Sequence, residues 1–371
     1  MGHRQHVGVI AYEMEGARSG VGRYLEGLLG GLPATEDWRW TLFFKGDPFE
    51  HPLFDSPAIT PLFDRRPAAR PVLWEQTRLP RLLRGLELDL LFSPGYSLPP
   101  LARVPMVVTL HDLSFEHLRG EFRWREGLRR RLLARSAARR ARRVLVDTEA
   151  MALDLRETYG VESRRLGVVP LAVEARFFDP LRVEGALEAL GVRPPYLLCL
   201  GSILPRRRID LVLEAFARVS REPLSLVLAG SDRLPQAGQL DAWIAASPAG
   251  GRVHRISYVP ESALPELYAR AEATLSLSSY EGYGLPPLES LAAGTPALVS
   301  PGMALDDLAP DYPHRVELEA GAVARGLEAL LEAPNAGALE RARAAVRALS
   351  WRRCSERFLA ELRLAAAGAK G

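Results

Sequence analysis

Short apolar runs alternate with stretches of helical periodicity along most of the chain. In the first half the runs are "HVGVIAY", "WTLFF", "LDLLFS", "MVVTLHD" and "RVLVDTE", and in the second half they are "PYLLCLGS", "LSLVLAGS", "RVHRISYV", "ATLSLS" and "PALVS". Continuous apolar strands separated by helices are typical of parallel sheets that helices cover on both faces. The pattern therefore predicts an α/β protein.

The alternation occurs as two series, and a chain of 371 residues is too long for one hydrophobic core. We therefore predict two doubly wound, Rossmann-like domains at residues 1–175 and 176–350, with a separate last helix within 351–371. Helices are expected at about 21–32, 209–220 and 263–271. Because ligands of such sheets bind beyond the carboxyl ends of the strands, the residues directly after each strand are the candidates for a site.

A glycine-containing loop follows the first predicted strand. Gly16, Gly20 and Gly22 of "EGARSGVGRY" precede a helix, where outward-pointing N–H groups suit an anion. The spacing is not the G-x-G-x-x-G of dinucleotide-binding proteins, and an ordinary strand-to-helix turn explains the glycines equally well.

In the second half, "GSILPRRRID" places Gly201 and Ser202 at the end of a strand. Arg206, Arg207 and Arg208 follow, just before a helix. Two or three guanidinium groups in this place are suited to clamp a diphosphate through charge-assisted hydrogen bonds. A cluster of solvated arginines is the alternative interpretation.

The segment "SSYEGYGLPPLESLAAGTPALVS", residues 278–300, predicts a loop that runs into a helix. Pro286 and Pro287 suit a first helical turn, where a missing N–H has little effect. The N–H groups of Tyr283, Gly284 and Leu285 are then expected to point at a ligand.

Two carboxylates flank this helix start. Glu281 lies in the loop and Glu289 about one turn inside the helix. Each accepts hydrogen bonds from two hydroxyl groups, as on a sugar ring. The combination fits a sugar nucleotide, with its diphosphate at the helix end. The alternative is a capped surface helix with two solvated glutamates.

These segments together resemble the retaining GT-B glycosyltransferases of family GT4, the "glycosyl transferase group 1" type. The resemblance covers nearly the whole chain through "SGVGRYLEGLL", "VPMVVTLHDLSF", "LGVVPLAV", "GSILPRR" and "SYEGYGLPPLESLAAGTPALVS". It is nearest to the mannosyltransferase-like branch used in bacterial surface-polysaccharide assembly. It implies two Rossmann-like domains facing across a cleft, with the last helix, from Trp351, crossing back onto the first domain.

The resemblance also implies roles for residues of the donor site. Arg206 and Arg207 would hold the diphosphate, although the family usually has lysine at the position of Arg207. Ser202 sits where some members carry another arginine. Glu281 would contact the transferred sugar and Glu289 the ribose. The backbone N–H groups of Gly284 and Leu285 would bind phosphate, and Gly201 and Tyr283 belong to the same donor-binding set.

Further roles fall on both domains. His111 would lie beside the transferred sugar, so Glu281, His111 and Arg207 are the residues expected to act in catalysis. Asp112 would orient the His111 turn. Gly20 and Val21 would close over the phosphates, and the base would rest near Tyr258 and Val259.

The expected chemistry needs no cofactor and no metal. The sequence contains no D-x-D motif, and arginines with a helix N-terminus are able to neutralise a leaving diphosphate. The resemblance implies a front-face reaction that retains configuration without a protein nucleophile. The expected donor is GDP-mannose, with UDP-sugars next, and the expected acceptor is a saccharide or lipid-linked hydroxyl. A non-catalytic sugar-nucleotide-binding protein is the main alternative. A phosphorylase of the same fold would need a pyridoxal-phosphate lysine, and neither lysine is well placed.

The charge is unevenly distributed. All but two of the 48 basic residues are arginine, and eleven arginines lie between Arg119 and Arg143. We expect Leu128, Leu132 and Leu133 to form the core side of a helix there. The arginines then offer a face for anionic lipid. A solvated helix is the alternative, and nucleic-acid binding lacks an aromatic platform.

The sequence shows neither a signal peptide nor a long apolar span. Cys199 and Cys354 are far apart and are expected to be buried, reduced thiols. We therefore expect a soluble cytoplasmic protein, with contact at the inner face of the membrane through the arginine-rich segment as a further expectation.

Overall fold

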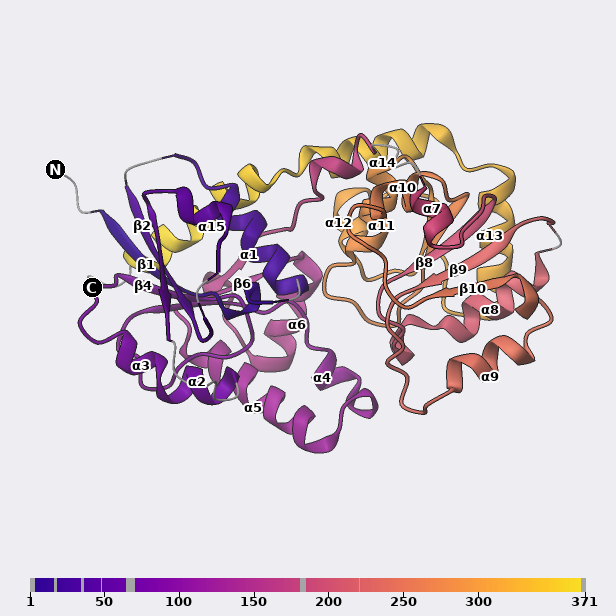
Figure 1. Cartoon of the computed structure of the whole chain (residues 1–371). Helices are drawn as coiled ribbons and strands as arrows, with labels where there is room; N and C mark the ends of the chain where they lie inside the picture. Colours follow the sequence, from indigo (N-terminus) through magenta and orange to yellow (C-terminus); the bar gives the residue numbers. More distant parts are fainter. Residues whose placement is uncertain are drawn as a thin grey trace. The chain divides into compact units, whose positions relative to one another are not determined.

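The computed structural model describes residues 4–16, 19–34, 37–47, 49–64, 71–180, 185–219 and 221–367. The chain divides into two compact units, Met1–Ala172 with Ser350–Gly371, and Val173–Leu349. Figure 1 shows that each unit is built on a sheet with helices on its faces. Every strand pairing is parallel, which confirms the predicted α/β class with two Rossmann-like sheets.

The first unit contains a seven-stranded sheet in the order β3-β2-β1-β4-β5-β6-β7. Strand β3 was not predicted, because "ITPLF" is only partly buried and contains Pro61. Proline is tolerated at a sheet edge, where one side of the strand has no ladder partner. The strands are β1 (Gln5–Ile10), β2 (Trp38–Phe44), β3 (Ile59–Phe63), β4 (Leu90–Ser93), β5 (Met106–Thr109), β6 (Arg143–Val146) and β7 (Leu166–Val168).

The last helix of the chain belongs to the first unit. It packs on α1, and the hydroxyl of Ser355 donates to the carbonyl of Leu28 at 2.6 Å. The phenyl ring of Phe358 lies against Trp40 and Phe92 of the sheet, so the helix is anchored by apolar contacts. The helices of this unit are α1 (Gly20–Gly30), α2 (Pro71–Thr77), α3 (Leu79–Leu82), α4 (Ser114–His117), α5 (Trp124–Arg140), α6 (Glu149–Tyr159) and α15 (Trp351–Ala367).

The second unit contains a five-stranded sheet in the order β10-β9-β8-β11-β12. Its strands are β8 (Tyr196–Leu200), β9 (Ser225–Ala229), β10 (Val253–Ile256), β11 (Ala273–Ser276) and β12 (Ala297–Val299). The strand order reverses between β8 and β11, and a crevice opens at such a switch point beyond the carboxyl ends of the strands. The loops after β8 and β11 are therefore the expected place for a ligand.

Apolar helix faces close the core of this second unit. Buried Val212 and Phe216 of α8 join Leu226 and Leu228 of β9 and Leu327 of α13 in one cluster. The helices are α7 (Ala186–Ala189), α8 (Ile209–Arg218), α9 (Gln239–Ala246), α10 (Leu264–Ala269), α11 (Leu285–Ala292), α12 (Ala304–Leu308), α13 (Ala320–Glu332) and α14 (Ala336–Ala348).

The arginine-rich segment differs from its prediction. It forms the short 3₁₀ turn Arg119–Glu121 and helix α5, but the leucines do not make the core side. Leu128 and Leu132 are 42 % and 61 % exposed, and Leu133 is half-buried. The prediction was wrong because the helix packs through small residues, which allow its backbone to approach its neighbours closely. The buried residues of α5 are Gly127, Ala134, Ala137 and Ala138.

Among the residues that the structure describes, no helix is both long and apolar enough to cross a membrane.

Candidate functional site

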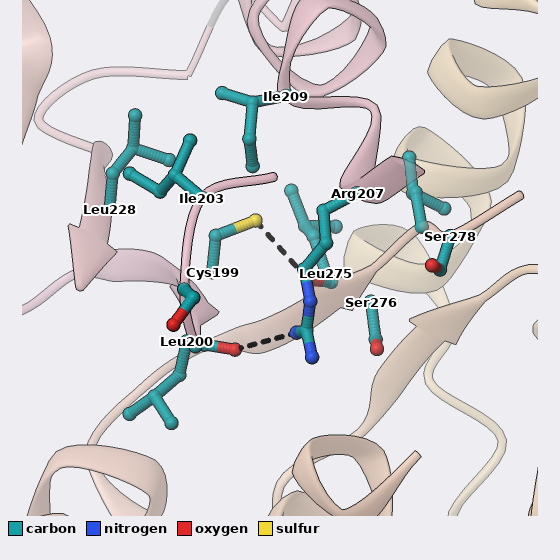
Figure 2. A pocket seen from close by; sticks show the side chains of 12 residues that line it. Cys199, Leu200, Ile203, Arg207, Ile209, Leu228, Leu275, Ser276 and Ser278 are labelled. Carbon is teal, nitrogen blue, oxygen red and sulfur yellow. Dashed lines mark hydrogen bonds between the residues drawn. The ribbon is translucent and has the colours of Figure 1, made fainter. Parts of the chain in front are cut away.

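The guanidinium group of Arg207 lies at the switch point of the second unit. Its Nη1 donates to the carbonyl of Leu200, the last residue of β8, at 3.1 Å. Its Nη2 lies 3.3 Å from Oε1 of Glu281, in the loop after β11. Figure 2 shows the Arg207 side chain directed at the end of β8. The structure therefore joins two of the predicted residues, from the two loops that border the switch point, in one ion pair.

Gly201 makes room for this arginine. Its φ is +120°, a conformation that L side chains rarely adopt, and a Cβ there would lie 2.8 Å from Nη1 of Arg207. The neighbouring hydroxyl of Ser202 lies 3.2 Å from that of Ser231, after β9. The strand end is thus shaped so that backbone and guanidinium approach each other closely.

The Arg207 side chain is closely packed, and not all of its N–H groups have hydrogen-bond partners among the described residues. Its Nε is buried and has no hydrogen-bond partner among the described residues. A buried donor without a partner costs roughly 1–3 kcal/mol. The adjoining cavity has a volume of about 10 Å³, near the lower limit for one water molecule. Cys199 lines it, and burial raises the pKa of its thiol to about 12, so it remains a neutral donor to the Leu275 carbonyl at 3.2 Å.

The three consecutive arginines have different surroundings. Arg208 adopts φ +45° and binds Asp210 through Nε and Nη2, at 3.0 and 2.8 Å, at the start of α8. The carbonyl of Arg206 accepts the N–H of Ser279 at 2.8 Å, which ties the arginine turn to the loop after β11. Within the run, Arg207 pairs with Glu281, whereas Arg208 pairs with Asp210 in the first turn of α8.

Helix α11 begins with backbone donors. Gly284 precedes it at φ +83°, a left-handed conformation that favours glycine. The N–H groups of Gly284 and Leu285 have no hydrogen-bond partner among the described residues, and Pro286 and Pro287 have no N–H to offer. Two amides at the positive end of the helix are thus available to an acceptor. The preceding Tyr283 is buried, and its carbonyl accepts the N–H of Ala304 at 2.8 Å.

The two glutamates of the segment have different partners. Glu281 is paired with Arg207 and its side chain is 14 % exposed. Glu289 lies inside α11, is 6 % exposed, and accepts the hydroxyl of Tyr268 from α10 at 2.9 Å. One carboxylate is held by a cation and the other by a phenol.

Tyr258 and Val259 follow β10 at the same edge of the sheet. Tyr258 is 72 % exposed and Val259 is half-buried. Neither residue lines the cavity beside Arg207.

The first unit contains a separate cavity of about 240 Å³. Val21 and His111 line it, together with Asp112 and the aromatic side chains of Tyr12, Tyr96 and Phe115. Gly20 begins α1, and the hydroxyl of the preceding Ser19 accepts the N–H of Gly22 at 2.9 Å. Asp112 accepts both the N–H and the hydroxyl of Ser114, at 3.0 and 2.8 Å, which fixes the turn after β5.

Both ring nitrogens of His111 face acceptors. Nδ1 lies 2.7 Å from Oδ2 of Asp147, and Nε2 lies 3.0 Å from the carbonyl of Pro94. Burial alone would lower the pKa of His111, but Asp147 and the Pro94 carbonyl outweigh it and raise the pKa. Burial also raises the pKa of Asp147, although the contact with His111 by itself would lower it. The pair therefore retains a proton, and Nε2 donates to Pro94 rather than accepting.

Sequence reasoning missed Asp147. A signal existed, because Asp147 directly follows β6 and His111 follows β5, and these two parallel strands are neighbours. Carboxyl ends of adjacent strands meet at one edge, so their polar residues come together.

Glu75 was missed as well. It is fully buried in α2 and accepts the hydroxyl of Ser97 at 2.7 Å, while the hydroxyl of Tyr12 lies at 3.5 Å. Burial raises the pKa of Glu75 to about 7. One glutamate in a short helical pattern gives no sequence signal for this placement.

Within the described part of the chain, no group of three or more His, Cys, Asp or Glu side chains is arranged to hold a metal ion.

Each unit of the chain matches a model of a known protein family. Residues 18–177 match the family described as "Glycosyltransferase Family 4", and residues 188–347 match "Glycosyl transferases group 1". A similar curated protein is an MMP alpha-(1->4)-mannosyltransferase from Mycolicibacterium hassiacum, 30 % identical over 217 residues, which are 55 % of this chain and 50 % of that protein. The chain thus spans about half the length of such curated relatives.

Solved structures share the fold over almost the whole chain. Sucrose-phosphate synthase from Thermosynechococcus elongatus aligns with a TM-score of 0.77 at 19 % identity, covering 98 % of this chain and 100 % of that one. Anabaena Alr3699/HepE, in complex with UDP and glucose, aligns with a TM-score of 0.72 at 16 % identity, covering 97 % and 99 %. The chain belongs to the GT4-type glycosyltransferases of the GT-B fold.

Proposed function

We propose that this protein transfers a hexose from a nucleotide-diphosphate sugar to a hydroxyl group of a saccharide or lipid-linked acceptor, with retention of configuration. The observation that carries the proposal is the Arg207–Glu281 pair at the switch point of the second unit. In the same unit, α11 begins with the N–H groups of Gly284 and Leu285, for which the described residues offer no hydrogen-bond partner. A cation, a carboxylate and helix-end donors are the groups that a sugar diphosphate requires.

Arg207 and the α11 amides would neutralise the charge that develops on the departing diphosphate. Such fixed donors stabilise a transition state without reorganising during the reaction. Arg206, Gly201 and Ser202 would complete this diphosphate site. A divalent cation is then unnecessary, and we expect turnover to persist in the presence of a chelator. Complete loss of activity on chelation, with recovery on adding Mg²⁺ or Mn²⁺, would contradict this.

The carboxylates of Glu281 and Glu289 would accept hydrogen bonds from hydroxyl groups of the donor. In the free protein Glu281 is paired with Arg207, and donor phosphate would compete for the guanidinium and release the carboxylate to the transferred sugar. Glu289, fixed by Tyr268, would bind the ribose. Tyr258 and Val259 would contact the base of the nucleotide. Tyr283 would fix the loop that leads into α11.

The acceptor would enter the cavity of the first unit, which Val21 lines. Gly20 and Val21 would close over the donor phosphates. The cavity volume of about 240 Å³ admits a single sugar ring, and the aromatic and carboxylate lining suits a polyhydroxyl ligand. The acceptor oxygen would form the new bond to the anomeric carbon as the bond to phosphate breaks, and its proton would pass to the leaving phosphate oxygen. His111 would act as a fixed positive group beside the transferred sugar, because both of its ring nitrogens are engaged, by Asp147 and by the Pro94 carbonyl.

GDP-mannose is the first candidate donor, supported by the mannosyltransferase among the relatives. A UDP-sugar is the second, supported by the complex of Anabaena Alr3699/HepE with UDP and glucose. We place the reaction in the cytoplasm, in surface glycan or glycolipid synthesis. Both cysteines are free and buried, as suits a reducing compartment.

Calorimetric titration with GDP, UDP and ADP, without metal, tests the donor site. We expect one nucleotide to bind more tightly than the others. Replacing Arg207→Gln should weaken that binding at least about tenfold, because a hydrogen bond to a charged group contributes roughly 1.5–3 kcal/mol. The matched control is Arg208→Gln, whose side chain binds Asp210 instead and should leave affinity nearly unchanged.

Two outcomes would contradict the proposal. If the folded protein binds none of the nucleotides, the donor site is not functional. If a nucleotide binds but candidate donors never release free nucleoside diphosphate, with or without saccharide acceptors, the non-catalytic sugar-nucleotide-binding alternative is favoured.

A further inference from the structure

The outward side of α5 carries a stripe of large apolar residues. Trp124, Leu128 and Leu132 follow one another at four-residue intervals, and are 71 %, 42 % and 61 % exposed. Residues four apart lie on one face of a helix. Three large side chains on one helix face therefore expose a continuous apolar strip to water.

Arginines border this strip. Glu126, the one acidic residue of α5, is bound by Arg130 at 2.6 Å. The guanidinium of Arg125 lies 5.2 Å from the ring centre of Trp124. The remaining positive charge of the face is uncompensated, because four exposed arginines have no carboxylate partner among the described residues: Arg125, Arg129, Arg139 and Arg140.

The fold itself does not require these large residues. Helix α5 is held through Gly127, Ala134, Ala137 and Ala138, which are on its buried side. The exposed leucines and tryptophan contribute little to that packing, and they cost solubility. A binding partner that contacts both the apolar side chains and the arginines would explain why these residues are exposed on α5.

We propose that the outward face of α5 is a docking surface for an anionic lipid bilayer. Trp124, Leu128 and Leu132 would enter the boundary between headgroups and acyl chains, and the arginines would contact lipid phosphates. Helices with one apolar stripe and flanking basic residues bind membrane surfaces in this way. A polyanion in solution would neutralise the arginines and leave the apolar strip in water, so the bilayer accounts for both features.

The docking surface lies on the same helix as one wall of the cavity in the first unit. Arg130 of α5 lines that cavity, and its guanidinium lies 5.5 Å from the ring centre of Tyr96. Docking would hold the cavity near the bilayer, where a lipid-linked acceptor resides. This consequence rests on the proposed glycosyl transfer, whereas the docking itself does not.

Flotation of the full chain with vesicles tests the surface without any activity assay. We expect binding to vesicles of phosphatidylcholine mixed with phosphatidylglycerol, and little binding to phosphatidylcholine alone. The double variant Arg129→Gln/Arg139→Gln should bind roughly 30-fold more weakly, at about fivefold for each basic residue near an anionic surface. The variant Leu128→Gln/Leu132→Gln should lose roughly tenfold or more.

Matched controls use exposed residues of the same unit outside α5. Arg81→Gln/Arg84→Gln and Leu73→Gln/Leu101→Gln should bind as the wild type does. No wild-type binding to anionic vesicles at low salt would overturn the proposal, as would equal losses in the control variants. If only the arginine variant loses binding, and heparin competes fully with the vesicles, the face binds polyanions in solution and the bilayer assignment is wrong. An α5 surface that captures an acidic protein but no vesicles would also overturn it.

Discussion

Replacement of Glu75 by glutamine should change how the stability of the first unit depends on pH. Glu75 is fully buried, and its hydrogen-bond donors include the hydroxyls of Ser97 and Tyr12. Its pKa is about 7 in the folded chain against an ordinary value of 4.5. Between these values the unfolded chain has lost a proton that the folded chain still holds. The wild type therefore becomes less stable as pH rises from 4.5 to 7.

The size of the effect follows from the two pKa values. At 1.36 kcal/mol for each pH unit, the free energy of unfolding should fall by roughly 3 kcal/mol across this window because of Glu75. Glutamine has nearly the same shape, keeps one oxygen that can accept from the hydroxyls of Ser97 and Tyr12, and cannot ionise. The Glu75→Gln variant should therefore be the more stable protein at pH 8 and about equal to the wild type at pH 4.5.

Urea unfolding of the full chain at pH 4.5 and pH 8 measures this difference. Trp74, which precedes Glu75 and is fully buried, provides a fluorescence signal from the site itself. Its neighbour in space, Tyr12, packs edge-on at 6.0 Å between ring centres. Glu87→Gln, at an exposed position of the same unit, is the matched control and should preserve the pH dependence of the wild type. If the Glu75→Gln and wild-type proteins lose stability equally with pH, the reasoning is refuted.

Three further predictions concern the candidate site. Glu281→Ala and Arg207→Ala should each reduce turnover at least about 100-fold with the fold intact by circular dichroism, since each loses interactions made in the transition state; near-normal turnover in either would remove its role. Asp147→Asn should lower the pKa of His111, because the carboxylate that raises it is gone; an unchanged imidazole titration by NMR would show that Asp147 does not hold the proton. Gly201→Ala should weaken nucleotide binding, because its Cβ would lie 2.8 Å from Nη1 of Arg207 at a φ of +120°; calorimetric affinity equal to that of the wild type would show that the guanidinium is free to shift.

The arrangement of α5 shows where sequence patterns mislead. Apolar residues at helical spacing usually mark the core side, and Leu128 and Leu132 follow that spacing. Their exposure could not be inferred, because the alanines and glycine on the opposite side also make a continuous packing surface. Which of two apolar sides is buried depends on what the rest of the sheet presents to the helix.

The sequence by itself indicated the alternation of strands and helices in two series, because apolar runs and helical periodicity are local properties, but it missed the edge strand β3. It also indicated which residues follow the strands: Gly201, Arg207 and Glu281 were singled out from their positions, whereas His111 was indicated only by the resemblance to the glycosyltransferase family. What only the tertiary structure decided was the pairing of groups distant in the chain. Arg207 meets Glu281 and His111 meets Asp147 because parallel strands bring their carboxyl ends to one edge. The proton that the His111–Asp147 pair retains likewise depends on the folded chain, because contact with Asp147 raises the pKa of His111 against the effect of burial, and burial raises the pKa of Asp147.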